Sequence, residues 1–142
     1  MNKKIIISSS DSNYFNLIKE LHLSLKNTGV LYEYDFAILD TGLDSKQLSY
    51  FRDNNVLIQK AEWNVEVPKY KILGRENLKT QVARAFLPDY FNNYKVYVWL
   101  DADIWLNDID SFLLYEKGAL KNKITIVPQS DRAYIKNANV EW

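Results

Sequence analysis

Two aspartates, Asp101 and Asp103, are the residues with the clearest potential for chemistry. They follow residues 96–100, an apolar run typical of a buried strand. Side chains two residues apart on an extended chain point to the same side, so we expect both carboxylates to face one point. Like charges that close need a shared proton or a cation, and hard divalent cations prefer oxygen ligands. The pair therefore predicts a metal site, and such a metal usually also binds the phosphates of a nucleotide or nucleotide sugar.

A solvated turn is the alternative interpretation of this pair, because aspartate is common in turns that follow strands. However, residues 104–106 are again apolar. Acids between buried segments cost desolvation free energy unless they are paired or bind a metal. We therefore favour the metal or nucleotide interpretation.

A second polar cluster, residues 8–14, follows the β-branched run of residues 5–7. The cluster predicts a turn and a helix cap, and capping alone could explain it. Alternatively its hydroxyls and backbone N–H groups bind a nucleotide, with Tyr14 stacked on the base and Asp11 or Asn13 bonded to the edge of the base. The second interpretation assigns cofactor binding to Ser8, Ser9, Ser10 and Tyr14.

Basic residues at positions 75–84 could pair with Asp101 and Asp103 or with a diphosphate. Arg75 and Lys79 share one helix face, and a solvated face is the simpler explanation for them. Arg84 lies beside the expected buried stripe, where arginine often pairs with a carboxylate or phosphate. We therefore choose Arg84 to orient one aspartate or neutralise diphosphate. His22, the single histidine, is expected to be structural.

The hydrophobic pattern alternates strands with helices. We expect strands at residues 5–7, 34–39, 56–58, 96–100 and 124–127. We expect helices at residues 14–25, 44–51, 76–87 and 110–114, with a loop at residues 60–74. In the third helix Leu78, Val82, Ala85 and Phe86 should face inward, and Pro88 should end or kink it. Trp99 and Trp105 are expected in the core or at its edge.

This alternation predicts an α/β fold with a mostly parallel, Rossmann-like sheet and flanking helices. Ligands of such sheets bind beyond the carboxyl ends of the strands. Both polar clusters follow strands at that edge, so we expect them to meet.

Composition limits the class of protein. The chain has 142 residues, the size of one domain, with 47% hydrophobic residues and 18 basic against 18 acidic residues. The balanced charge argues against a nucleic-acid partner. Cysteine is absent, and no apolar run is long enough for an integral membrane segment or a signal peptide. We therefore expect a cytoplasmic protein.

Three segments in order resemble the nucleotide-sugar glycosyltransferases of the GT-A fold, most closely the family-eight enzymes related to glycogenin and bacterial galactosyltransferases. Residues 5–14 are similar to the uridine-binding opening of that family. Residues 83–88 look like the helix with its basic donor-site residue. Residues 95–105 look like its strand and Asp-x-Asp motif.

The resemblance implies a UDP-sugar donor and a Mn²⁺ or Mg²⁺ cofactor. It implies that Asp101 and Asp103 ligate the metal and that Asp101 also touches the ribose. Ser8, Ser9 and Tyr14 would lie near the uridine, and Arg84 near Asp101 or the donor sugar. The acceptor would be a saccharide, lipid or protein of unknown identity.

The chain departs from the family in two respects. The family's third metal ligand is a downstream histidine, and this sequence has none after His22. Its acceptor-binding half is also missing. We therefore expect residues 1–142 to be a single donor-binding domain, either part of a truncated glycosyltransferase or a reduced protein. A non-catalytic nucleotide-sugar-binding module and a structural α/β domain remain alternatives. A dehalogenase-like phosphatase is less favoured, since that family's Asp pair follows the first strand.

Overall fold

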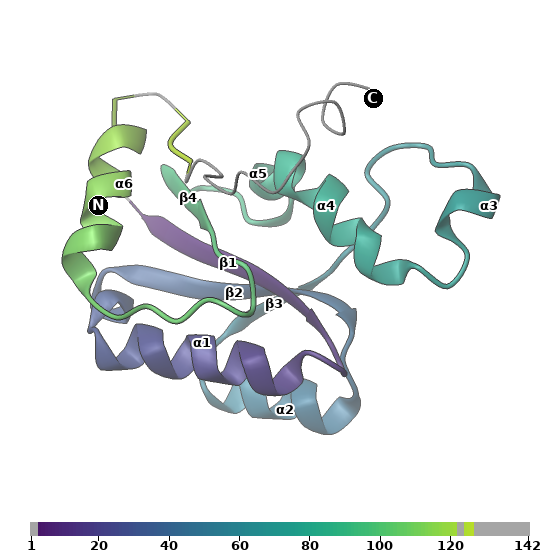
Figure 1. Ribbon diagram of the computed structural model, residues 1–142, viewed down its shortest axis with the longest axis horizontal. Helices are drawn as coiled ribbons and strands as arrows, with labels where there is room; N and C mark the ends of the chain where they lie inside the picture. The colour runs from purple at the N-terminus through teal and green to yellow at the C-terminus, as the bar shows by residue number, and fades with distance from the viewer. Residues whose placement is uncertain (1–2, 122–123, 127–142) are drawn as a thin grey trace, which may run out of the picture.

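A four-stranded sheet with helices on both faces forms the centre of the computed structural model, which describes residues 3–121 and 124–126 (Figure 1). The strands are β1 (Lys4–Asp11), β2 (Tyr34–Gly42), β3 (Leu57–Lys60) and β4 (Val96–Trp99). They lie in the order β3-β2-β1-β4, and every neighbouring pair is parallel. The α/β, Rossmann-like fold predicted from the sequence is therefore confirmed.

β1 lies in the middle of the sheet because its apolar residues can be buried on both faces. Ile5, Ile6 and Ile7 are fully buried. The strand continues to Asp11, so the serines after Ile7 do not form the predicted turn. β2 pairs with β1 along its whole length and satisfies the backbone groups of these serines. This pairing outweighs the weak strand propensity of serine.

One face of the sheet is covered by α1 (Phe15–Asn27), α2 (Ser45–Asp53) and α6 (Ile109–Ala119). α1 buries Ile18, Leu21 and Leu25 against this face, whereas Leu17 is exposed. His22 is also buried and stacks on Phe36, with 5.4 Å between ring centroids. The structural role predicted for this histidine is confirmed.

Local sequence signals explain where α2 begins. The Asp44 side chain accepts a hydrogen bond from the Gln47 backbone, and the Gln47 side chain accepts one from the Asp44 backbone. This reciprocal capping box satisfies N–H groups that a helix start leaves unpaired. The helix predicted over residues 44–51 is therefore confirmed, with Asp44 as its N-cap.

The opposite face is covered by a broken helical segment rather than the single helix predicted over residues 76–87. It contains α4 (Lys79–Ala83), α5 (Leu87–Tyr90) and two 3-10 turns, Glu76–Leu78 and Arg84–Phe86. The residues buried here are Thr80, Ala83 and Leu87. The predicted inward face was therefore wrong: Ala85 is exposed, and Leu78, Val82 and Phe86 are only partly buried. Pro88 lies in the first turn of α5, where its missing N–H costs nothing.

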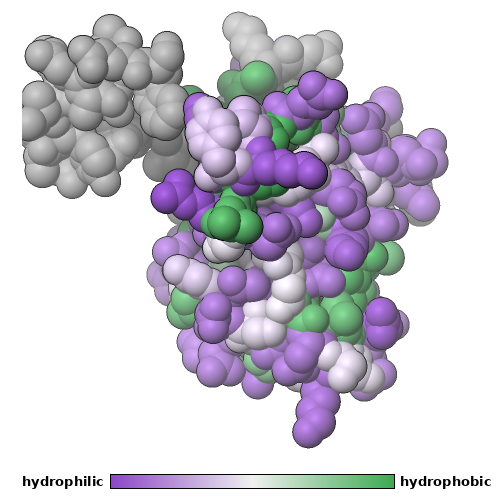
Figure 2. Space-filling view, turned by 90° about the vertical axis from the view of Figure 1, so that its right-hand side faces the viewer, coloured by the Kyte–Doolittle hydropathy of each residue, from purple (hydrophilic) through white to green (hydrophobic). Residues whose placement is uncertain are grey.

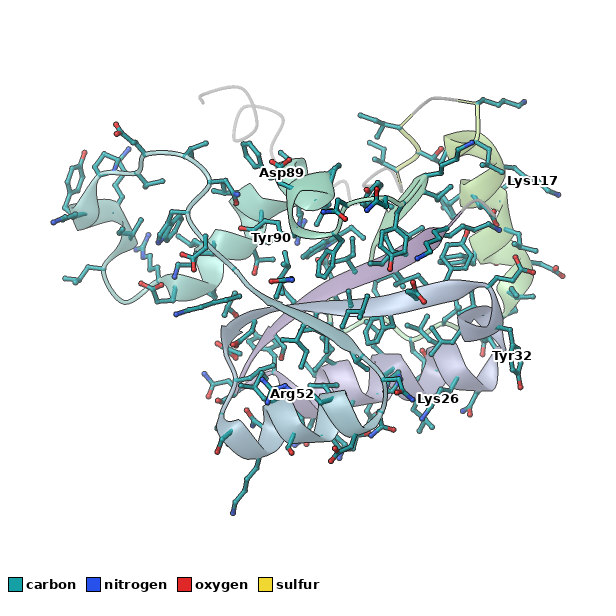
Figure 3. The ribbon with its side chains drawn as sticks, turned by 180° about the vertical axis from the view of Figure 1, so that it is seen from behind. Lys26, Tyr32, Arg52, Asp89, Tyr90 and Lys117 are labelled. Atoms are coloured by element: carbon teal, nitrogen blue, oxygen red, sulfur yellow. The ribbon has the colours of Figure 1, made fainter. Side chains whose placement is uncertain are left out.

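A segment that protrudes between β3 and α4 was predicted to be a loop and contains one short helix, α3 (Lys69–Ile72). Tyr90 of α5, labelled in Figure 3, bonds the start of this segment. Its hydroxyl donates to Asn64 Oδ1 and accepts from the Glu62 backbone N–H. The surface on this side is mostly hydrophilic, with hydrophobic side chains in separate patches (Figure 2).

After β4 the chain turns and crosses α1 before it enters α6. Ser24 Oγ accepts the Leu106 N–H at 3.0 Å and fixes this crossing. Trp99 and Trp105 were predicted in the core or at its edge: Trp99 is partly buried against the core, whereas Trp105 is half exposed. Asp108 caps α6, and its bonds to Ser111 lower the pKa of this carboxyl. Residues 124–126 form no strand, and Val127 lies outside the described residues.

An ion pair joins α6 to the start of β1. Lys4 Nζ lies 2.5 Å from the buried carboxylate of Glu116 and 3.0 Å from that of Glu33. The hydrogen bond with Glu116 raises the pKa of Lys4. A buried carboxylate without this partner would carry a large desolvation cost.

Candidate functional site

The candidate site lies at the switch point of the sheet. The chain builds β1, β2 and β3 outward in one direction and then places β4 on the other side of β1. The loops that leave β1 and β4 therefore diverge at the carboxyl edge, where open α/β sheets bind ligands. The residues after these two strands are the two polar clusters that the sequence singled out.

A cavity of about 260 Å³ lies between these loops and α4. Its wall contains six of the seven predicted site residues: Ser9, Ser10, Tyr14, Arg84, Asp101 and Asp103. The exception is Ser8, whose side chain is fully buried and whose hydroxyl has no hydrogen-bond partner among the described residues. The side chain of Ser8 therefore does not line the cavity.

The aspartates reach this cavity by a geometry different from the one predicted. β4 ends at Trp99, and the Ile104 N–H donates to the Asp101 carbonyl at 3.1 Å, so the pair lies in a turn. The extended backbone assumed for it is therefore wrong. Asp101, Ala102 and Asp103 still line the same cavity. The Asp101 side chain is 53% exposed, so solvent and ligands reach it.

Arg84 and Trp99 both bond one oxygen of Asp101. Arg84 Nη2 lies 2.6 Å from Asp101 Oδ1, and Trp99 Nε1 donates to the same oxygen at 2.9 Å. The guanidinium carbon also lies 4.8 Å from the centroid of the Trp99 ring. The contact predicted between Arg84 and an aspartate is thus confirmed.

Three aspartates line this cavity, Asp11, Asp101 and Asp103. Asp11 Oδ1 accepts two backbone N–H groups, so Asp101 and Asp103 are the pair considered for a metal. Within residues 3–121 and 124–126 no group of three or more His, Cys, Asp or Glu side chains could hold one. Two oxygen-donor side chains nevertheless fit Mg²⁺ or Mn²⁺, which keep most of their other positions for water and phosphate. Asp101 Oδ2 and the oxygens of Asp103 are not used by the hydrogen bonds found in the described part of the chain.

The other wall comes from β1 and the turn after it. Asp11 Oδ1 accepts the N–H groups of Asn13 and Tyr14, at 2.9 and 3.2 Å. This turn presents the Tyr14 ring, which is 54% exposed, at the mouth of the cavity. Asp11 rather than a serine thus organises the start of α1.

Four further polar residues that line the cavity were not singled out from the sequence. They are Thr41, Asn77, Thr80 and Gln81. Thr80 Oγ1 donates to Ser9 Oγ at 2.9 Å and joins α4 to β1. Three of these residues have the spacing of one helix face that also contains Arg84: Asn77, Thr80 and Gln81. A different choice of the inward face would therefore have found them.

The remaining basic candidates lie outside the cavity. Lys79 Nζ pairs with Glu76 at 2.6 Å, and Arg75 is exposed. Neither lines the wall. The exposed position predicted for Arg75 is confirmed, but the Lys79 side chain is only 14% exposed, so the solvated position predicted for it is wrong.

A second cavity, of about 490 Å³, lies at the amino ends of β2 and β3. Lys26 and Tyr32, labelled in Figure 3, border it together with His22 and Asp35. It is larger, yet it lies at the sheet edge opposite to the aspartate pair. Because the carboxylates and Arg84 converge on the smaller cavity, we assign the candidate function there.

The fold is that of the GT-A glycosyltransferases. The chain superposes on the galactosyltransferase LgtC, solved in complex with donor and acceptor sugar analogues, with a TM-score of 0.55 and 20% identity, over 76% of this chain and 41% of LgtC. The LgtC active-site mutant Q189E gives the same TM-score at 19% identity, over the same shares of the two chains. The apo bifunctional glycosyltransferase WbbM gives 0.55 at 17% identity, over 79% of this chain and 21% of WbbM.

The chain therefore spans about two fifths of LgtC and one fifth of WbbM. No family model and no curated protein match the sequence. Within the described residues, none of the helices is both long and apolar enough to span a membrane.

Proposed function

We propose that this chain binds the donor of a metal-dependent glycosyltransferase, which moves a hexosyl group from a UDP-sugar to a saccharide, lipid or protein acceptor. One observation carries the proposal: the Arg84–Asp101 ion pair and Asp103 share a cavity at the switch point of a GT-A sheet. LgtC, which has the same fold, was solved with donor and acceptor sugar analogues.

In this proposal Asp101 and Asp103 hold Mn²⁺ or Mg²⁺. The donor set fits, because two carboxylates supply hard oxygen ligands while a diphosphate supplies others. When bound, the metal neutralises the charge that develops on the departing UDP. Arg84 holds one oxygen of Asp101 and thereby leaves the other for the metal.

The wall from β1 would receive the nucleoside. Ser9, Ser10 and the backbone near Asp11 offer hydrogen bonds at the end of β1, and the exposed Tyr14 ring offers a stacking surface. The cavity is smaller than the roughly 300–1,000 Å³ of typical ligand pockets. A bound nucleotide sugar would therefore extend beyond its walls, toward the place where an acceptor meets the donor.

Residues 1–142 would act as one donor-binding unit, and we propose a cytoplasmic location. The location is compatible with the absence of cysteine, since the sequence offers no disulfide of the kind that marks proteins of oxidising compartments.

A non-catalytic nucleotide-sugar-binding module is the second candidate. It is favoured by the finding that no third acidic, histidine or cysteine ligand joins the aspartate pair in the described part of the chain. Both candidates predict that UDP binds, but only the enzyme releases UDP from a UDP-sugar.

The test is release of UDP from UDP-hexoses in the presence of Mn²⁺, by transfer or slow hydrolysis. We expect release by the wild type and at least a tenfold lower rate for Asp103→Ala. Asp53→Ala is the control, because Asp53 is exposed and does not line the cavity. UDP binding without release would favour the binding module. A protein that neither binds UDP nor releases it from a UDP-sugar would contradict both candidate functions.

A further inference from the structure

We propose that Trp99 is a positioning residue that fixes Asp101 for metal binding through its Oδ2 atom alone. This inference rests on the proposed function. It assigns to a residue expected only to pack in the core a part in the electrostatics of the site. Contacts around a single carboxylate oxygen support this role.

The first step is the convergence of donors on Asp101 Oδ1. Arg84 Nη2 approaches it at 2.6 Å and Trp99 Nε1 at 2.9 Å. Each carboxylate oxygen has two lone-pair positions, so these two N–H groups occupy both positions of Oδ1. Oδ2 is then the Asp101 oxygen left for a cation.

The second step is the restraint on the rotation of the carboxylate. A single hydrogen bond from Arg84 would let the carboxylate pivot, since the arginine side chain is long and about one third exposed. Trp99 lies two residues before Asp101, at the end of β4. It is partly buried against the hydrophobic residues between the sheet and the segment with α4 and α5. Its indole N–H therefore comes from a rigid element and gives the carboxylate a second fixed direction.

The third step is the effect of Trp99 on Arg84. The guanidinium lies over the indole ring, 4.8 Å from its centroid, a geometry in which the face of the ring attracts the cation. Arg84 Nε is buried and has no hydrogen-bond partner among the described residues, so the stacking accounts for the position of this side chain. Trp99 thus orients both members of the ion pair.

The consequence concerns metal geometry. With Oδ1 fully bonded, Asp101 would ligate the metal through Oδ2 alone. The other coordination positions of the metal would be filled by Asp103, phosphate oxygens and water. Groups that orient a metal-ligating side chain typically contribute 10- to 100-fold to metal affinity. Because this site is half exposed, we expect an effect at the lower end of that range.

Two substitutions separate the contributions of the N–H group and the ring. Trp99→Phe removes the N–H donor and keeps an aromatic face under Arg84. Trp99→Leu removes both. Trp105→Phe is the matched control, because Trp105 is half exposed and does not line the cavity.

The measurement is the ratio of UDP dissociation constants in EDTA and in saturating Mn²⁺, obtained by calorimetry. We expect the ratio to fall about tenfold in Trp99→Phe, to fall further in Trp99→Leu and to stay unchanged in Trp105→Phe. UDP affinity in EDTA should stay within about twofold in Trp99→Phe. Loss of fold lowers the active fraction but does not change this ratio in the folded molecules.

One result would overturn the inference while the proposed function stands: an unchanged ratio in Trp99→Phe. If UDP affinity falls equally with and without Mn²⁺, the ratio is unchanged and Trp99 is merely structural. A wild-type protein whose UDP affinity does not respond to Mn²⁺ would instead contradict the proposed function itself, and the positioning role with it.

Discussion

Thr80 Oγ1 donates a hydrogen bond of 2.9 Å to Ser9 Oγ and so joins α4 to the carboxyl end of β1. Thr80 is buried, although it lies on the wall of the candidate cavity. The contact fixes the distance between the helix that carries Arg84 and the strand that leads to Tyr14. Geometry at the proposed nucleotide site thus depends on a pair of neutral hydroxyls.

A double-mutant cycle tests this contact. We expect a coupling free energy of about 1 kcal/mol between Thr80→Val and Ser9→Ala, the usual net value of a neutral hydrogen bond. Valine keeps the shape of threonine, so the cycle isolates the hydroxyl. Urea unfolding of the wild type, the two single variants and the double variant gives the coupling. A value near zero would mean that the bond does not fix α4 against β1.

Arg84 should matter more for the donor than Lys79, its neighbour on the same segment. Arg84 bonds Asp101 at the cavity wall, whereas Lys79 pairs with Glu76 outside it. We predict that Arg84→Ala weakens binding of a UDP-sugar with Mn²⁺ about tenfold, because a partly exposed, charge-assisted contact is lost. Lys79→Ala should change it less than twofold. Equal effects, measured by calorimetry, would show that the wrong basic residue was assigned to the donor.

His22 should make the stability of the fold sensitive to acid. Burial of the ring, with a smaller contribution from the nearby charge of Lys26, lowers the pKa of His22 to about 4 from 6.5. The unfolded chain therefore binds more protons than the folded chain between these values, and the free energy of unfolding falls as pH drops from about 6.5 to 4. The loss has an upper limit of about 3 kcal/mol.

Substitution of the histidine tests this explanation. His22→Phe keeps an aromatic ring against Phe36 but cannot titrate. Its free energy of unfolding should depend on pH less steeply than that of the wild type between pH 6.5 and 4, in urea titrations at fixed ionic strength. Parallel curves for the two proteins would exclude His22 as the source of acid sensitivity.

Several parts of the fold could be predicted because their signals are local. The apolar spacing of α1 and the capping pair Asp44 and Gln47 lie within one element and need no knowledge of its neighbours. The length of β1 could not be predicted in this way. Its serines are extended because β2 pairs with them, and that partner is about thirty residues away in the sequence.

In the candidate site too, some residues could be predicted from the sequence and others could not. The cluster of Asp101, Asp103 and Arg84 was found from residue type and from the strand before it. Thr80 and its neighbours were missed because the face of Leu78 and Val82 was chosen as the buried one, whereas the structure buries Thr80 and Ala83. The bond from Trp99 to Asp101 could not be predicted from strand geometry, because β4 ends at Trp99 and Asp101 lies in the turn that follows it.

The central claim is that a nucleotide diphosphate and a divalent cation bind together at Asp101 and Asp103. Its most direct measurement is the dissociation constant of UDP with Mn²⁺ and with EDTA, for the wild type, Asp103→Asn and the control Asp53→Asn. We predict that Mn²⁺ tightens UDP binding at least about tenfold, or 1.4 kcal/mol, in the wild type and the control, and has little effect in Asp103→Asn. The account would be contradicted by a wild type that binds no UDP, or by Mn²⁺ tightening UDP binding in Asp103→Asn as much as in the wild type.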